Sequence, residues 1–266
     1  MSGVLKSFRH PDFSATAELW EYWGNKINMD DTSVLSDIPE FSSVRTKFQN
    51  KEKRIDCYSF DYIAPSLEII GAHAIRSFCK SLESLDATFI CSNSKVTNSA
   101  IVTSYNASFF AAKSLCYLLG FSPLNRDSNI TIDAFYELDD GKSNRAFRYD
   151  RWGHAQTWAL TTRLVDTLRV TNELKETKRY LRKMKLAKTS KVRNSFSYAD
   201  NIISPIGNGS ASDFPDNSEI SPSEEERRYV EISKAILKLS SSILISAKVQ
   251  DLLLYHTTER RLELAA

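Results

Sequence analysis

The chain has 266 residues and a formal net charge of +2, with 42% apolar and 26% charged residues. These values are ordinary for a folded protein, and they exclude a collagen, a coiled-coil rod and a wholly disordered chain. Only eight glycines and seven prolines occur, which argues against a glycine-rich nucleotide-cradling enzyme and against a turn-rich all-β sandwich.

The N-terminal region, residues 1–55, is expected to hold one helix and an irregular extension. Apolar residues at roughly helical spacing predict a helix over 13–27, and Ser14 is a candidate for its cap. Residues 28–56 are rich in turn residues and then in lysine, which indicates short helices and loops.

Two strong helices are predicted in the centre of the chain. Leu67, Ile70 and Ala74 belong to a repeat of threes and fours that predicts a helix over 66–85. A second repeat predicts a helix over 98–119 that is apolar on nearly all sides, so we expect it to be central and buried. Gly120 follows it and suits a left-handed stop.

The remaining elements follow in chain order. Residues 129–138 are the one convincing strand, and they are expected to form a hairpin arm or an extended connector. A polar loop over 139–154 leads to a helix over 154–172, whose pattern allows it to continue through 173–188.

A linker is predicted over 204–222 from its Pro, Gly, Ser and Asn content, and a last amphipathic helix begins at 223 and extends to about 254. The fold class is therefore predominantly all-α: a helical bundle over 56–203 with one minor β element, and an extra C-terminal helix in 223–266.

Localisation and redox state follow from absences in the sequence. No stretch approaches the roughly 20 continuous apolar residues of a membrane span, and the first residues lack an apolar signal-peptide core. We expect a cytoplasmic protein without membrane contact. The four cysteines are widely spaced and form no CxxC pair, so we expect buried small side chains rather than disulfides or metal ligands.

Motifs for several enzyme classes are missing from the sequence. The four histidines are not paired at ligand spacing, and no HExxH, Walker or GxSxG pattern occurs. We therefore expect neither a metal nor a cofactor.

His154 is the main candidate for chemistry, because it begins a predicted helix and follows Arg145, Arg148 and Arg151. A helix N-terminus and nearby guanidinium groups disfavour the charged imidazolium. A neutral imidazole could then take the 2′-hydroxyl proton of RNA while an arginine stabilises the phosphate, without a metal. On one continuous helix Arg148 would lie roughly 120° from His154. The two converge only if Arg148 lies in the preceding loop or if the site spans a dimer. Arg151, three residues before His154, is the rival.

A basic run from Lys175 to Arg193 contains nine Lys or Arg residues and one acid. It predicts contact with a phosphate backbone, and Tyr180 could stack on a base. The residues chosen for substrate binding are Lys178, Arg179, Arg182, Lys183 and Lys185. The competing interpretation is a solvated helix end whose charge complements the helix dipole.

Residues 104–121, SYNASFFAAKSLCYLLGF, resemble the signature helix of HEPN-domain proteins, and Arg148 and His154 match that family's Arg-x(4–6)-His motif. The helix after His154 also resembles the corresponding family helix. The resemblance implies an α-helical bundle, usually dimeric, with a metal-independent ribonuclease site at the dimer cleft, often in antiphage or toxin–antitoxin systems. In active members a polar residue often follows the motif arginine. Here Tyr149 stands there and Asp150 comes next, so Asp150 is assigned a supporting role.

Three functional hypotheses result. The first is an endoribonuclease that acts as a homodimer on RNA, with Tyr105 and Asn106 supporting the His154 loop. The second is a non-catalytic helical module that holds a nucleotidyltransferase, or another protein from the same operon, through the C-terminal helix. The third is a nucleic-acid-binding regulator that uses only the basic run.

Overall fold

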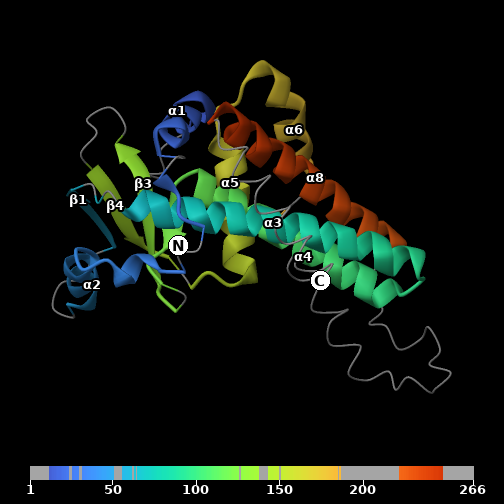
Figure 1. The fold of residues 1–266 in the computed structure, drawn as a ribbon, viewed down its shortest axis with the longest axis horizontal. Helices are drawn as coiled ribbons and strands as arrows, with labels where there is room; N and C mark the ends of the chain where they lie inside the picture. Colours follow the sequence, from blue (N-terminus) through green and yellow to red (C-terminus); the bar gives the residue numbers. More distant parts are fainter. Residues whose placement is uncertain are drawn as a thin grey trace.

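The computed structural model describes residues 12–23, 26–29, 32–50, 56–61, 63, 65–125, 127–137, 143–149, 151–184, 186 and 222–247. It is predominantly helical, with one antiparallel sheet of four strands at one end of a long helical hairpin (Figure 1). The predicted fold class, mainly helical with a minor β element, is confirmed. None of the helices in this part of the chain is long and apolar enough to cross a bilayer.

The hairpin consists of α3 (Pro65–Asn93) and α4 (Thr97–Leu118), which confirms both central helices and extends the first by two turns. Two buried serines join the helices. Ser81 donates to the carbonyl of Ala107 at 2.7 Å, and Ser114 donates to the carbonyl of Ala74 at 2.9 Å. After α4, Gly120 has a φ of 86°, as its expected role as a left-handed stop requires.

Helix α8 (Pro222–Ser246) lies along α4 and crosses above the hairpin in Figure 1. Its main apolar stripe is buried, with Ile232, Ile236 and Ile243 at 0% exposure. The C-terminal helix, through which a partner protein was expected to bind, thus packs by this stripe on the rest of the chain. Of the linker predicted over 204–222, residues 204–221 lie outside the described residues, and Pro222 is the first residue of α8. The continuation of the helix from 248 to 254 also lies outside the described residues.

The sheet has the strand order β1 (Cys57–Asp61), β4 (Ser143–Arg148), β3 (Ile130–Glu137) and β2 (Phe121–Pro123). Strand β3 confirms the predicted strand. It is an arm of the β3–β4 hairpin, which was one of the two expectations, but it also pairs with β2, so the β element is a sheet rather than one strand. The prediction of a polar loop over 139–154 is also wrong in part, because the residues at its centre form strand β4.

The sheet accommodates this polar strand because a charge is neutralised inside it. Arg145 and Asp133 pair across β4 and β3 at 3.4 Å, with side-chain exposures of 2% and 0%. Neither residue has the apolar character by which a buried strand is recognised in a sequence.

The helix expected after His154 is shorter than predicted. Helix α5 (His154–Thr167) ends well before residue 172, and η4 (Asn172–Leu174) then leads into a separate α6 (Lys175–Lys183). A continuous helix through 188 is therefore wrong. Leu168 and Leu174 are both buried where the chain turns between α5 and α6. The helical spacing in the sequence predicts a continuous helix there, but burial of both side chains favours the turn.

The N-terminal elements are α1 (Phe13–Trp23), η3 (Leu35–Asp37) and α2 (Phe41–Gln49), so the expected helix and short helical turns are present. The cap of α1 is Asp12 rather than Ser14. The Asp12 carboxylate accepts hydrogen bonds from the backbone N–H groups of Ser14 and Ala15 at 3.0 and 3.1 Å.

The cysteines fit the expected burial only in part. Cys79 and Cys116 are buried, Cys91 is half-buried, and Cys57 is exposed because it lies on edge strand β1. Burial raises the pKa of the Cys116 thiol to about 12, which keeps it protonated and unreactive at neutral pH.

The buried ion pair generates a stability prediction with a control inside the same chain. Asp133→Asn should lower the free energy of unfolding by about 3 kcal/mol, because it leaves the Arg145 charge uncompensated in the sheet. Asp127→Asn breaks the exposed Arg151–Asp127 pair and should cost less than about 1 kcal/mol. Urea unfolding followed by circular dichroism measures both, and equal losses would contradict this account of the sheet.

Candidate functional site

His154 is the first residue of α5 and is half-buried against α4. Its Nδ1 atom lies 2.8 Å from the hydroxyl of Tyr105, and its ring centroid lies 4.2 Å from that of Phe109. The chain reaches this position through Gly153, whose carbonyl accepts the first hydrogen bond of the helix from Thr157 at 3.0 Å. The sequence prediction that His154 begins a helix is confirmed.

Hydrogen bonds around Tyr105 hold the His154 ring by its Nδ1 atom. The indole N–H of Trp158 can only donate, and it donates to the Tyr105 hydroxyl oxygen at 3.3 Å. The Tyr105 hydroxyl can donate to Nδ1 of His154 or accept from it, according to the tautomer of the imidazole. In either tautomer the contact with Tyr105 is made by Nδ1, so a proton exchanged with RNA would move at Nε2.

Helix α8 closes the cluster from the opposite side. Tyr105 and Tyr229 are both 0% exposed, and their rings meet edge to face at 5.4 Å. Burial, followed by the nearby Glu225 carboxylate, raises the pKa of Tyr229 far above its ordinary value, so this ring stays neutral. The bond to His154 comes from Tyr105, whereas Asn106, the other residue chosen as a support, is half-buried one residue along α4.

Arg148 points away from His154. It is the last residue of β4, where it donates to the carbonyl of Phe48 in α2 and lies 5.4 Å from that phenyl ring. The next residue, Tyr149, donates to the carbonyl of Gln156 in α5 at 3.0 Å. Successive side chains of an extended segment point to opposite faces. Arg148 therefore faces α2 while its neighbour Tyr149 faces α5.

Arg151 lies three residues before His154 and is exposed. It pairs with Asp127 at 2.5 Å, with exposures of 70% and 78% for the two side chains. Such a solvent-exposed pair has little energy, so a phosphate could compete for the guanidinium. Asp150 and Lys185, both chosen from the sequence, lie outside the described residues.

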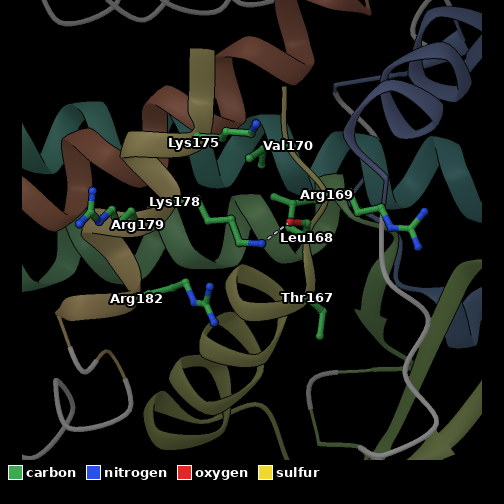
Figure 2. A pocket seen from close by; sticks show the side chains of 8 residues that line it. All are labelled: Thr167, Leu168, Arg169, Val170, Lys175, Lys178, Arg179 and Arg182. Atoms are coloured by element: carbon green, nitrogen blue, oxygen red, sulfur yellow. Dashed lines mark hydrogen bonds between the residues drawn. The ribbon is translucent and has the colours of Figure 1, made fainter. Parts of the chain in front are cut away.

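A basic pocket of about 620 Å³ lies where the end of α5 faces α6. It is lined by Thr167, Leu168, Arg169, Val170, Lys175, Lys178, Arg179 and Arg182. Figure 2 shows Lys175, Lys178 and Arg182 extending from α6 towards the end of α5, while the guanidinium groups of Arg179 and Arg169 point outward on opposite sides. Three of the five residues chosen from the sequence for substrate binding meet here. Lys183 is exposed at the end of α6 and is not part of the lining.

The cations of the basic pocket make different interactions within the fold. Lys178 donates to the carbonyl of Leu168 at 2.6 Å and so caps the C-terminal end of α5. Burial lowers the pKa of Lys178, and the positive charge of Arg182 lowers it further, while Asp166 acts in the opposite direction. Arg182 pairs with Asp166 at 3.1 Å and Arg179 with Glu176 at 3.7 Å, and all four of these side chains are at least 42% exposed.

Two cations of the basic pocket were not selected by the sequence reasoning. Arg169 precedes the basic run, and Lys175 belongs to it but was not among the chosen side chains. Arg169 and Lys175 line the same pocket because the helix is interrupted between α5 and α6. In the described part of the chain, no group of three His, Cys, Asp or Glu side chains could hold a metal ion.

The charges in the basic pocket make the pKa of Lys178 depend on Arg182. Arg182→Gln should raise that pKa, because it removes a repelling positive charge and releases Asp166 from its ion pair. Arg179→Gln is the matched control and should change the Lys178 pKa much less, because its guanidinium points outward. Titration of the lysine side-chain signals by NMR measures both, and a fall in the Lys178 pKa in the Arg182 variant would refute the prediction.

Comparison of the chain with protein-family models, with curated proteins and with solved structures gives no match. The resemblance to HEPN-domain proteins therefore depends only on residues 104–121, on the Arg148–His154 spacing and on the helix after it. It stays a prediction. The function has to be argued from the geometry of His154 and of the basic pocket.

Proposed function

We propose that this protein binds RNA, with phosphates of the RNA backbone held in the basic pocket. The observation that carries the proposal is the gathering of five Lys and Arg side chains around one open hollow, with no carboxylate among its described lining residues. Neutralising phosphates with Lys or Arg releases counterions, which is the main source of affinity for nucleic acids.

The charge of the basic pocket exceeds what the fold itself needs. The bond from Lys178 to Leu168 uses one cation to complement the negative end of α5. Arg179 and Arg182 are held only by exposed ion pairs, which are weak, and Lys175 is exposed at the start of α6. These groups can exchange their partners for phosphate oxygens at small cost. The net charge of the whole chain is only +2, so the attraction is local to this pocket.

The binding prediction uses the two inward cations that do not cap α5. Lys175→Gln combined with Arg182→Gln should weaken binding of a single-stranded RNA oligomer by about tenfold or more, and should reduce the slope of log affinity against log salt by about 1.4. The measurement is fluorescence anisotropy over a salt series.

Its control is Lys234→Gln combined with Lys238→Gln, which removes two exposed lysines from α8 and should leave RNA affinity nearly unchanged. Equal losses in the two double variants would show that RNA binding depends on overall charge, and the proposal for the basic pocket would then be wrong.

A second candidate function, metal-independent RNA cleavage at His154, is favoured by the Tyr105–His154 hydrogen bond. That bond holds the imidazole by Nδ1 at a helix start. Acting at Nε2, the imidazole would take the 2′-hydroxyl proton as the 2′-oxygen attacks phosphorus, and it would return that proton to the leaving 5′-oxygen as the phosphorus–oxygen bond breaks. The guanidinium on the phosphate would be Arg151, because Arg148 faces α2. The chemistry at His154 requires a 2′-hydroxyl, which is why RNA is preferred to DNA as the ligand.

The cleavage test compares three alanine variants in EDTA. We expect RNA cleavage to be lost in His154→Ala and reduced by about 10²-fold or more in Arg151→Ala, because both groups would act on the reacting phosphate. Arg148→Ala should retain cleavage. Gel analysis of end-labelled RNA gives the rates, and a DNA oligomer of the same sequence should stay intact. Loss of cleavage in Arg148→Ala together with full activity of Arg151→Ala would instead require a site shared between two subunits.

A further inference from the structure

Lys178 differs from Lys175, the other lysine of the basic pocket, in how its side chain is held. Lys178 is half-buried between α6 and the end of α5, whereas Lys175 is exposed. In Figure 2 the Lys178 side chain reaches towards Leu168, where Nζ donates to the carbonyl oxygen at 2.6 Å. This hydrogen bond keeps the amine of Lys178 at one place on the wall of the pocket.

The surroundings of Lys178 favour the uncharged form of its amine. Burial lowers the pKa of Lys178, and the positive charge of Arg182 lowers it further, while the charge of Asp166 acts in the opposite direction. Partial burial and a neighbouring cation are two means by which proteins make a lysine nucleophilic. In the uncharged amine one N–H points at the Leu168 carbonyl, so the lone pair of the nitrogen points away from that carbonyl.

The same pocket can hold a phosphate group beside this amine. Lys178 and Arg182 are four residues apart on α6 and therefore share a face of the helix, and both extend towards the end of α5 in Figure 2. The ion pair of Arg182 with Asp166, at 3.1 Å, is exposed, so a phosphate can replace the carboxylate at small cost. A guanidinium can bind two phosphate oxygens through parallel N–H groups. The volume of about 620 Å³ leaves room for a small phosphorylated molecule.

We propose that Lys178 is a modification site for acyl phosphates, with the phosphate of the reagent held at Arg182 and its carbonyl carbon next to the Lys178 amine. Nζ attacks the carbonyl carbon, so an N–C bond forms while the bond from that carbon to the bridging oxygen breaks. Inorganic phosphate leaves with the electron pair of the broken bond, and it takes the proton that the nitrogen loses. The product is an uncharged, acylated lysine. Acylation removes one of the five cations on which the proposed RNA binding depends, but the modification itself does not rest on that function.

The test is a time course of lysine acetylation by acetyl phosphate on the full chain, mapped by mass spectrometry. We expect Lys178 to react at least about fivefold faster than Lys175, and faster by a similar factor than Lys234 and Lys238, because docking places the reagent beside this amine. Lys175 shares the pocket but is exposed, and the two lysines of α8 lie outside its lining. A rate at Lys178 that does not exceed the rates at these three lysines would overturn the proposal.

The role of Arg182 is tested by substitution. Arg182→Gln removes the partner of the phosphate and should raise the Lys178 pKa, so acetylation of Lys178 by acetyl phosphate should become about tenfold slower or more, with an unchanged circular dichroism spectrum. Arg179→Gln is the matched control and should change the rate by less than about twofold, because its guanidinium points outward. An unchanged rate at Lys178 in the Arg182 variant would contradict the proposal.

A reagent without phosphate separates docking from the reactivity of the amine. The N-hydroxysuccinimide ester of acetic acid transfers the same acetyl group, so Arg182→Gln should slow its reaction with Lys178 only through the change in the amine. We expect this loss of rate to be at least about threefold smaller than the loss with acetyl phosphate. Equal losses with the two reagents would mean that Arg182 does not hold the phosphate, and the proposed site would then be wrong. The measurement gives the same answer whether or not the protein binds RNA.

Discussion

The close packing of α3 against α4 is the contact on which the rest of the described fold depends. Small residues at the interface, among them Ala74 and Ala107, let the two backbones approach closely enough for Ser81 and Ser114 to donate across to main-chain carbonyls. These bonds fix the register of two helices that are otherwise held by non-directional apolar burial. Helix α8 then covers the outer side of α4, and the sheet is attached through Gly120 at its end. The rigid surface that results is what orients the start of α5.

One stripe of α4 contacts the chain at the start of α5. Tyr105, Phe109, Lys113 and Tyr117 recur every four residues and therefore share a face of the helix. Tyr105 and Phe109 contact His154, while Tyr117 stacks on Trp152, two residues earlier in the chain. Lys113 stands between Phe109 and Tyr117, 5.9 Å from both ring centroids. The residues before α5 are thus held by side chains from one helix face, and a charge at Lys113 would be felt on both sides of it.

The parts of the fold that sequence reasoning predicted are those whose signal is local. Helices α3 and α4 follow from apolar spacing, and Gly120 from its place after such a repeat. The sheet was missed because its pairing is not local. Strand β1 pairs with β4, about 85 residues later in the chain, and Arg145 is acceptable in the interior only because Asp133 lies opposite it. Likewise, the spacing between Arg148 and His154 was visible in the sequence. The face on which Arg148 projects was not, since it depends on the register of β4.

The two ends of α5 differ in charge, and this difference shapes what each end can bind. The C-terminal carbonyls of a helix carry partial negative charge, and Lys178 neutralises one of them directly. Part of the positive charge of α6 is therefore structural, and a variant of Lys178 would perturb the end of α5 together with any ligand site. At the N-terminal end the helix dipole favours an anion, so a phosphate could approach His154 without a positive charge on the imidazole. The hydrogen bond between Tyr105 and Nδ1 sets the orientation of that imidazole.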